Sequence, residues 1–200
     1  MPDGARVVEV DGGTRAVRVL SRALAEAFGG GPPVLPVDPQ APQARATVAA
    51  MRPDDPMPES AAVLIATSGS SGHPKGVLLP AAALTASARA THARLGGPGR
   101  WLLATPAQYI GGLQVLVRSL LSGLEPGVLD LSAGFRPDAF AAAAEPVLAE
   151  PGPRYTALVP TQLHRLLDDG DAGLQAARGF DAIVVGGAAV PADLQARADA

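Results

Sequence analysis

Residues 67–76 hold the densest group of chemically useful side chains in the sequence. The segment reads TSGSSGHPKG, with four hydroxyl side chains, three glycines and Lys75 in ten positions. Glycines let backbone N–H groups turn toward an anion, hydroxyls donate hydrogen bonds to phosphate oxygens, and an ammonium group supplies a point charge. The segment therefore predicts a phosphate-binding loop.

A flexible linker is the alternative interpretation of so many glycines and serines. Two observations favour phosphate binding. The segment follows the apolar run of residues 61–66, which is typical of a strand buried on both faces. Lys75 is also the only lysine among 16 basic residues, so this one position holds an ammonium group where arginine fills all the others. The spacing matches neither the pattern GxxxxGK[ST] nor the dinucleotide pattern GxGxxG.

A second segment, residues 105–112, supplies candidates for binding a small substrate. It reads TPAQYIGG and precedes an apolar run with helical spacing. Tyr109 could line a pocket or simply pack in the core. Arg118, farther along the run, could bind a carboxylate through both of its terminal nitrogens, or it could lie exposed on the helix.

A third segment, residues 184–191, reads VVGGAAVP. Its first residues belong to an apolar strand-like run, and the two glycines follow at once. Gly186 and Gly187 would let a flat ligand approach the backbone closely, although a plain turn between a strand and a helix would also use them.

Together the three segments resemble the AMP-forming acyl-CoA synthetases, the adenylate-forming superfamily. Residues 67–76 are similar to its phosphate-loop signature, residues 105–112 to its acyl-pocket segment, and residues 184–191 to the Gly-Gly-Ala turn that borders its adenine and acyl sites. The resemblance covers about residues 60–200. The short region before it and the run of residues 109–119 are most similar to o-succinylbenzoate–CoA ligases of the actinobacterial type.

The resemblance implies a ligase that works in two steps. A carboxylate attacks the α-phosphate of ATP to give acyl-AMP and pyrophosphate, and the thiol of coenzyme A then displaces AMP. It implies ATP, Mg²⁺ and coenzyme A, with a small carboxylic acid as substrate, most specifically o-succinylbenzoate in menaquinone biosynthesis. Another small-acid ligase of the superfamily and a nucleotide-binding module without catalysis are the alternatives.

The resemblance also implies roles for individual residues. Lys75 is expected to act at the reacting phosphates. The nucleotide is expected to contact Thr67, Ser68, Gly69, Ser70, Ser71, Gly72, Lys75, Gly186, Gly187 and Ala188. The acid is expected to contact Tyr109, Gly111, Gly112 and Arg118, and no residue is assigned to a metal. Gln108 departs from the family, whose members often have histidine there.

Alternating strands and helices must position these residues. Short apolar runs, such as residues 61–66 and 155–159, alternate with helix-like runs, such as residues 15–28 and 110–121. This pattern predicts an α/β fold with a mostly parallel sheet and helices on both faces. The resemblance assigns that fold to the N-terminal part of the large domain of adenylate-forming enzymes.

Two parts of that large domain are expected. Residues 1–58 would form a short N-terminal segment, and residues 59–200 an incomplete ATP/AMP-binding α/β subdomain. The family's motifs beyond the Gly-Gly turn are missing, which leads us to expect that the 200 residues alone do not complete thioester formation. An uncovered strand near Val185 could pair with a second copy, so a homo-oligomer is a further expectation.

Composition and charge exclude several protein classes. A net charge of −3 argues against a general nucleic-acid-binding surface, and no apolar run is long enough for a membrane span. Residues 1–10 lack the basic and apolar parts of a secretory signal. The absence of cysteine excludes disulfides and thiolate sites and favours a cytoplasmic location.

Overall fold

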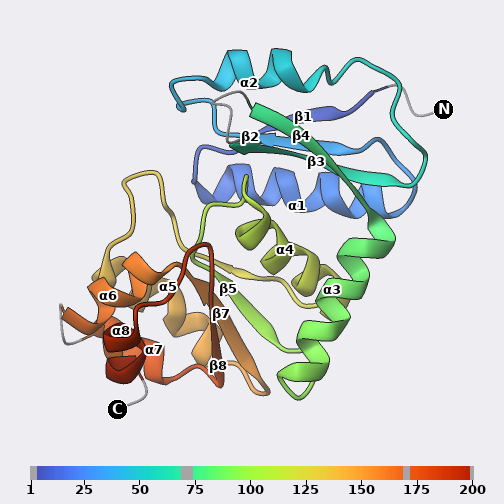
Figure 1. The fold of residues 1–200 in the computed structure, drawn as a ribbon. Coiled ribbons are helices and arrows are strands. Elements are labelled where there is room, and N and C mark those ends of the chain that lie inside the picture. Colours follow the sequence, from blue (N-terminus) through green and yellow to red (C-terminus); the bar gives the residue numbers. More distant parts are fainter. Residues whose placement is uncertain (1–3, 69–73, 169–171, 199–200) are drawn as a thin grey trace.

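The computed structural model describes residues 4–68, 74–168 and 172–198. Within these residues the strands form two four-stranded sheets (Figure 1). Sheet A has the strand order β1-β2-β3-β4, with bounds β1 (Arg6–Glu9), β2 (Val34–Val37), β3 (Ala61–Ser68) and β4 (Pro74–Pro80). Sheet B has the order β6-β5-β7-β8, with bounds β5 (Arg100–Leu103), β6 (Gly127–Val128), β7 (Arg154–Leu158) and β8 (Ala182–Val185).

The β3–β4 hairpin forms one edge of sheet A. β1, β2 and β3 are parallel, whereas β4 runs antiparallel to β3. In this register Thr67 lies opposite Lys75, and Ser68 lies opposite Pro74. The sequence predicted a loop over residues 67–76; the structure instead includes residues 67–68 and 74–76 in the two strands, because the antiparallel ladder extends to them. Residues 69–73 lie outside the described part of the chain.

All neighbouring strands of sheet B are parallel. Trp101 lies opposite Tyr155, and Tyr155 lies opposite Ala182. Because parallel strands have their carboxyl ends at one edge, the segments that follow β5, β7 and β8 all emerge at the same edge of the sheet.

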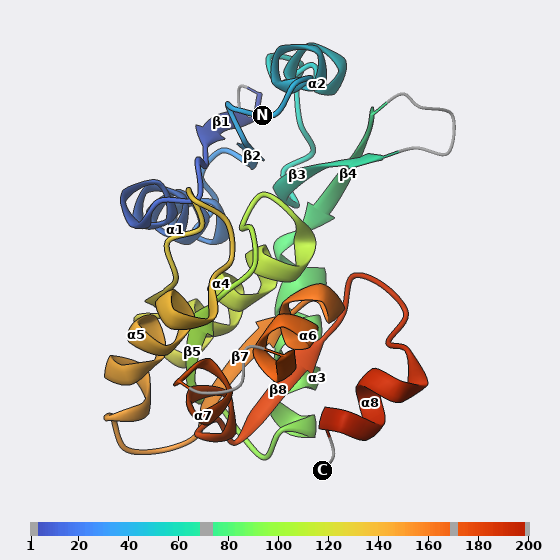
Figure 2. The ribbon, with the colours of Figure 1, turned by 90° about the vertical axis from the view of Figure 1, so that its left-hand side faces the viewer.

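Helices cover both faces of each sheet. Their bounds are α1 (Thr14–Phe28), α2 (Ala44–Met51), α3 (Ala81–Arg94), α4 (Ile110–Ser122), α5 (Pro137–Leu148), α6 (Pro160–Asp168), α7 (Ala172–Arg178) and α8 (Ala192–Ala198). Sheet A lies between α2 and α1, and sheet B lies between α4 and α5, so that α1 and α4 separate the two sheets (Figure 2).

Strand side chains alternate between cores because successive residues point to opposite faces of a sheet. On β5, Trp101 and Leu103 enter the large core between the sheets, whereas Leu102 joins Phe140 of α5 on the other side. On β3, Leu64 packs in a third, small core beneath α2. The continuous apolar runs predicted as strands therefore reflect burial on both faces.

The predicted α/β fold with mostly parallel strands and covering helices is confirmed. The structure adds that the strands divide between two sheets, which local sequence patterns do not reveal. β2 pairs with β3, so strands from both sides of residue 58 share sheet A. The helix expected over residues 137–148 is present with these bounds and includes Pro146, whereas the strand expected over residues 127–131 ends at Val128.

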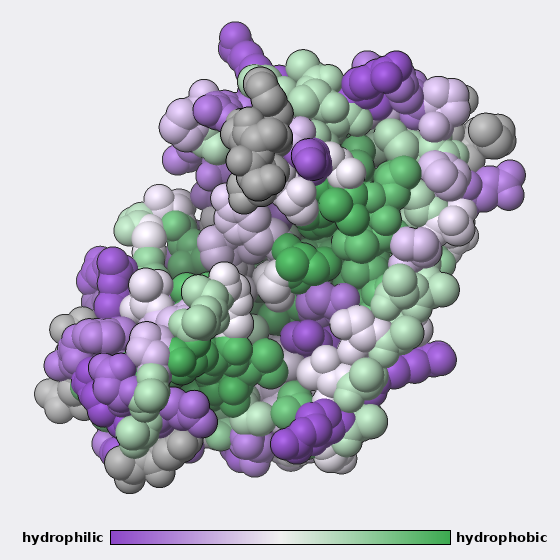
Figure 3. Space-filling view, viewed as in Figure 1, coloured by the Kyte–Doolittle hydropathy of each residue, from purple (hydrophilic) through white to green (hydrophobic). Residues whose placement is uncertain are grey.

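Apolar side chains are exposed along the outer strand of sheet A. Figure 3 shows them gathered over β4 and the start of α3, and Val77 and Leu78 on β4 are each 40% exposed. None of the helices in the described part of the chain combines the length and apolar character needed to cross a membrane.

Candidate functional site

A cavity of about 300 Å³ joins three segments that are far apart in the sequence. Thr67 and Pro74 come from the β3–β4 hairpin, Gln108 and Tyr109 precede α4, and Asp38 follows β2. The phosphate hairpin and the predicted acid-binding segment therefore meet at one cavity. This is the arrangement that a reaction between a phosphate compound and a small acid requires, because both reactants must be held in contact.

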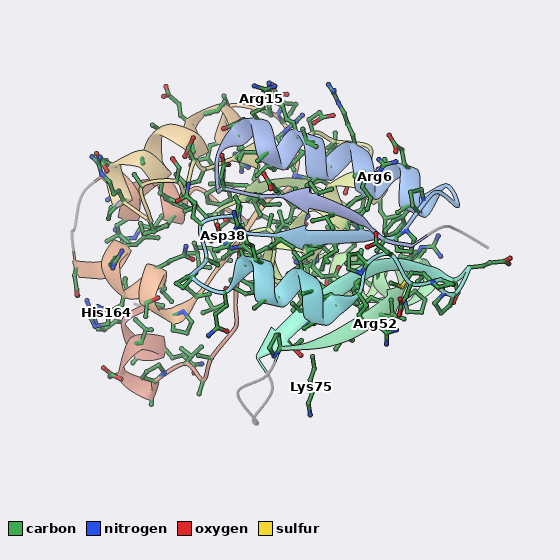
Figure 4. All side chains as sticks on the ribbon, turned by 90° about the horizontal axis from the view of Figure 1, so that it is seen from above. Arg6, Arg15, Asp38, Arg52, Lys75 and His164 are labelled. Atoms are coloured by element: carbon green, nitrogen blue, oxygen red, sulfur yellow. The ribbon has the colours of Figure 1, made fainter. Side chains whose placement is uncertain are left out.

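Lys75 follows Pro74, which lines the cavity, but Lys75 is not itself among the lining residues; its side chain is exposed. The hydroxyl Oγ1 of Thr67 donates a hydrogen bond to the backbone oxygen of Lys75 over 3.1 Å, which fixes the two strands of the hairpin together. The side chain of Lys75 extends away from the start of β4 (Figure 4). No carboxylate of the described residues lies within 4 Å of its ammonium group.

Several residues of the predicted phosphate loop cannot be placed. Gly69, Ser70, Ser71 and Gly72 lie outside the described residues. Ser68 belongs to β3 by its backbone, opposite Pro74. Their expected contacts with phosphate stay predictions.

Tyr109 and Gln108 present polar groups at the start of α4. Tyr109 has an extended backbone, with φ −102° and ψ 155°, and precedes the first residue of the helix. Its side chain is 60% exposed, so it lines the cavity and does not pack in the core. The side-chain oxygen Oε1 of Gln108 is buried and has no hydrogen-bond partner among the described residues. A substrate group that donates a hydrogen bond could fill this gap.

Gly111 and Gly112 have different surroundings although they are neighbours. A Cβ atom on Gly112 would lie 2.4 Å from the backbone oxygen of Pro106, so the helix approaches this segment more closely than any other residue would allow. A Cβ on Gly111 would have no atom within 4 Å. Gly112 therefore sets the position of α4, and Gly111 borders open space.

Arg118 is buried, with 8% of its surface exposed, and it is not among the residues that line the cavity. Its Cζ atom lies 4.8 Å from the ring centroid of Trp101, a distance typical of a cation–π contact. Burial lowers the pKa of Arg118. The structure therefore does not bring Arg118 next to Tyr109, and the alternative of an exposed helical arginine is also wrong. Its contact with an acid stays a prediction.

His92 of α3 lies close enough to this arginine to be affected by its charge. The pKa of His92 is lowered mainly by burial and secondly by repulsion from Arg118. Its Nε2 atom has no hydrogen-bond partner among the described residues. Both effects favour the neutral form of the His92 imidazole beside the buried guanidinium of Arg118.

The Gly-Gly turn lies at the carboxyl end of β8. The backbone N–H of Gly186 donates a hydrogen bond to the oxygen of Leu158 over 3.1 Å, which ends the pairing of β7 with β8. Gly187 has φ +86°, a conformation that favours glycine. Gly187 and Ala188 are exposed. Because β5 and β8 belong to one parallel sheet, this turn and Tyr109 lie at the same edge.

Asp38 was missed by the sequence analysis. It follows the short strand β2 and lines the cavity, where its Oδ1 atom accepts a hydrogen bond from the backbone N–H of Gln40 over 2.8 Å. The only signal was an acidic residue at the end of a predicted strand. Its relevance depends on the pairing of β2 with β3, which the sequence did not reveal.

A resident metal does not fit the residues described. Within residues 4–68, 74–168 and 172–198, no three His, Asp or Glu side chains lie close enough to hold a metal ion. A Mg²⁺ ion that binds together with ATP takes most of its ligands from phosphate oxygens and water, with one or two carboxylates from the protein, so the Mg²⁺ implied by the resemblance stays a prediction. No reaction step is therefore assigned to a metal.

Comparisons with known proteins show the family to which the chain is related. The sequence pattern of the family described as AMP-binding enzyme matches residues 12–200. A probable 2-succinylbenzoate–CoA ligase of Mycobacterium tuberculosis is 42% identical over 186 residues, which cover 93% of this chain and 47% of that protein. A 2-succinylbenzoate–CoA ligase of Enterococcus faecalis is 43% identical over 67 residues, which cover 32% of this chain and 14% of that protein.

Solved structures share the fold. E. coli MenE with a bound phenylether-linked analogue of OSB-AMS has a TM-score of 0.69 and 23% identity, covering 100% of this chain and 47% of that chain. O-succinylbenzoate CoA synthetase from Bacillus subtilis, bound to the product analogue OSB-NCoA, has a TM-score of 0.74 and 19% identity, covering 98% and 46%. The chain thus spans about half the length of the mycobacterial relative and of these structures.

Proposed function

This chain belongs to the AMP-binding enzyme family, and from that premise we propose that it supplies the phosphate- and acid-binding region of an ATP-dependent acid–CoA ligase. The substrate we propose is 2-succinylbenzoate, and the product is 2-succinylbenzoyl-CoA, an intermediate of menaquinone biosynthesis. The observation that carries this choice is the 42% identity over 186 residues to the mycobacterial relative of that name. The cytoplasmic location and the homo-oligomer stay predictions.

The proposed reaction has two balanced steps. A carboxylate oxygen of the acid attacks the α-phosphorus of ATP, the bond to the β-phosphate oxygen breaks, and acyl-AMP and pyrophosphate result. The sulfur of coenzyme A then attacks the acyl carbon and AMP leaves with the bonding electrons. ATP and coenzyme A are thus cosubstrates.

In this proposal the hairpin holds the phosphates while the start of α4 holds the acid. The ammonium group of Lys75 would neutralise charge on the β- and γ-phosphates as pyrophosphate leaves, with hydroxyls such as that of Thr67 nearby. Tyr109 and Gln108 would contact the acid from the other side of the cavity. Gly186 and Gly187 would border the adenine at the same edge of sheet B.

A pyrophosphate-release assay on the complete gene product tests the proposal. A panel of acids is compared: 2-succinylbenzoate, benzoate, succinate and a straight-chain fatty acid, each with ATP. We expect release with 2-succinylbenzoate to exceed release with the other acids, and a coenzyme A thioester to follow. Equal rates for all acids would contradict the choice of 2-succinylbenzoate as substrate. ATP binding without formation of any adenylate would contradict the proposed reaction class.

One observation keeps a second candidate open, another small-acid ligase of the same family. The preference for an acid with two carboxylates partly rested on Arg118, which does not line the cavity. A monocarboxylic acid would not need that partner. The same panel decides between the two, because a monocarboxylic acid would then give the fastest release.

A further inference from the structure

A second cavity of about 810 Å³ lies between α1 and the last turns of α4. Its lining includes Leu116 and Leu124, which flank the end of α4, and Val128 of β6. Tyr109 lies at the opposite end of α4. The groove lining on α4 begins at Leu116, seven residues after Tyr109, so about 10 Å of helix separates the two cavities. This second cavity, which we term the α1–α4 groove, is therefore separate from the candidate site.

The walls of the α1–α4 groove are largely apolar. Val17 of α1 and Leu116 of α4 are almost fully buried and line it, and Leu120 is 37% exposed beside them. Figure 2 shows α1 and α4 next to each other. A volume of this size is within the range of about 300–1,000 Å³ that small-molecule sites occupy.

Two arginines line the groove without a carboxylate partner. Arg18 and Arg22 lie four residues apart on α1 and therefore on the same face of the helix. No carboxylate of the described residues forms an ion pair with either side chain. The only acidic residue in the lining is the exposed Glu125 on the opposite side. The formal charge of the lining is thus +1, from two arginines and one glutamate.

Ser119 adds an unused hydrogen-bonding group. It is 2% exposed and lines the groove, and its hydroxyl Oγ is buried with no hydrogen-bond partner among the described residues. Two other helical serines behave differently: Ser21 and Ser122 donate to the backbone oxygens of Val17 and Arg118, one turn earlier. The buried hydroxyl of Ser119 therefore lies within the wall of the groove and is not open to its interior.

We propose that the α1–α4 groove binds a small aromatic carboxylate. The carboxylate accepts hydrogen bonds from the guanidinium groups of Arg18 and Arg22, and the ring lies against Leu116 and Leu120. The proposal does not depend on the proposed ligase reaction, because no residue of the candidate site takes part.

Isothermal titration calorimetry with 1-naphthoate on the purified chain tests the proposal. We expect saturable binding of one molecule, with weaker binding of the uncharged 1-naphthamide. The double variant Arg18→Gln/Arg22→Gln should weaken 1-naphthoate binding about tenfold or more, because two charge-assisted contacts are lost. Glu125→Gln should strengthen binding, since it removes the one negative charge of the lining.

Matched controls distinguish binding in the groove from binding elsewhere on the chain. Arg89→Gln, an exposed arginine on α3 away from the groove, should leave binding unchanged. Thermal unfolding of each variant checks that it is folded. Amide chemical shifts should move at Ser119 and Leu120, and saturating AMP should not displace 1-naphthoate.

Three results would overturn the proposal. They are no saturable binding at about 1 mM 1-naphthoate, unchanged affinity in a folded Arg18→Gln/Arg22→Gln variant, and displacement by AMP together with shifts confined to the Tyr109 end of α4. The last result would place the ligand in the candidate site instead.

Discussion

Lys75 is the residue through which the proposed phosphate contacts are most directly tested. Its side chain is exposed, and the register of the hairpin places it opposite Thr67, which lines the cavity. We expect Lys75→Ala to lower kcat/KM for ATP by about 10- to 100-fold, because a charge-assisted hydrogen bond contributes about 1.5–3 kcal/mol. The KM for the acid should change little. Steady-state kinetics of pyrophosphate release measure both.

Lys75→Arg is the matched control for this prediction. It keeps the charge but changes the shape of the head group, so it should recover part of the lost rate. Unchanged kinetics in Lys75→Ala would contradict the assignment of the hairpin to phosphate binding.

The buried pair of His92 and Arg118 predicts an acid-sensitive stability. The pKa of His92 is lowered from 6.5 by burial and then by Arg118, so the unfolded chain binds a proton more readily than the folded one. The free energy of unfolding should therefore be highest above pH 6.5 and fall as the pH decreases below that value. Urea unfolding between about pH 7.5 and 5.5 measures the change.

Two variants test the cause of this pH dependence. His92→Gln should reduce it, whereas Arg89→Gln, on the exposed surface of the same helix, should leave it in place. Arg118→Met should raise the pKa of His92, because it removes the second cause of the lowering. A stability profile that is the same in His92→Gln and in the unaltered chain would contradict the prediction.

Arg118→Met also tests the contact with a substrate carboxylate. Replacing a buried cation that has no carboxylate partner by an apolar side chain of similar length should change the free energy of unfolding by less than about 1.5 kcal/mol. If Arg118 reaches the second carboxylate of 2-succinylbenzoate in the complete protein, the KM for that acid rises and the KM for ATP does not. Unchanged KM values for 2-succinylbenzoate and for ATP would contradict a contact between Arg118 and the acid.

At the level of elements, the start of α4 decides how the acid-binding segment is presented. Gly112→Ala should destabilise the protein by about 1–3 kcal/mol, because the added methyl group would lie 2.4 Å from the backbone oxygen of Pro106. The methyl group added by Gly111→Ala would have no atom within 4 Å. This variant should keep or slightly raise the stability, because alanine has a higher helix propensity than glycine. Thermal unfolding compares the two variants directly.

The Gly111→Ala variant tests whether the substrate occupies the open space next to Gly111. If the acid occupies the region next to Gly111, the folded variant should have a higher KM for the acid. Equal destabilisation by the two substitutions would mean that the close approach at Gly112 is not what positions α4.

At the scale of the whole molecule, Asp130 connects the two sheets. It follows β6 of sheet B, and its carboxylate accepts hydrogen bonds from the backbone N–H and the hydroxyl of Ser132. The same carboxylate faces the backbone N–H of Thr14, the first residue of α1 on sheet A. These hydrogen bonds lower the pKa of Asp130. Asp130→Ala should lower the free energy of unfolding by about 1 kcal/mol, as for other residues that cap a helix.

Asp130→Asn is the control for this contact between the two sheets, because the side-chain oxygen of asparagine can still accept a hydrogen bond at the start of a helix. We expect it to cost less than the alanine variant in the same urea titration. An alanine variant as stable as the unaltered chain would show that other contacts, such as that between the N–H of Leu131 and the oxygen of Gly12, hold the sheets together without it.

The openness of the candidate site predicts that the 200 residues alone do not form the thioester. Tyr109 is 60% exposed, and Lys75 and Gly187 are exposed as well. Charged contacts in an open cavity are screened by water, and acyl transfer requires that water be excluded. Mass spectrometry for the coenzyme A thioester, with the complete gene product as control, measures the outcome, and sustained turnover by the 200 residues would contradict it.

The sequence alone predicted most elements, because helices and strands follow from the local spacing of apolar residues. Helix α4 and its end at Gly123, which has φ +67°, are examples. The sequence also pointed to the hairpin as a phosphate-binding segment, since its hydroxyls, glycines and single lysine are adjacent in the chain. Information of this kind is contained in a few neighbouring residues.

Only the tertiary structure decided which distant residues meet. It divided the strands between two sheets, brought Asp38 to the cavity shared by Thr67 and Tyr109, and buried Arg118 against Trp101 away from that cavity. Each outcome depends on how strands pair and which helix face packs inward. Such contacts join residues tens of positions apart, and the free energy that selects them comes from burial and packing of the whole chain, which no local pattern of residues records.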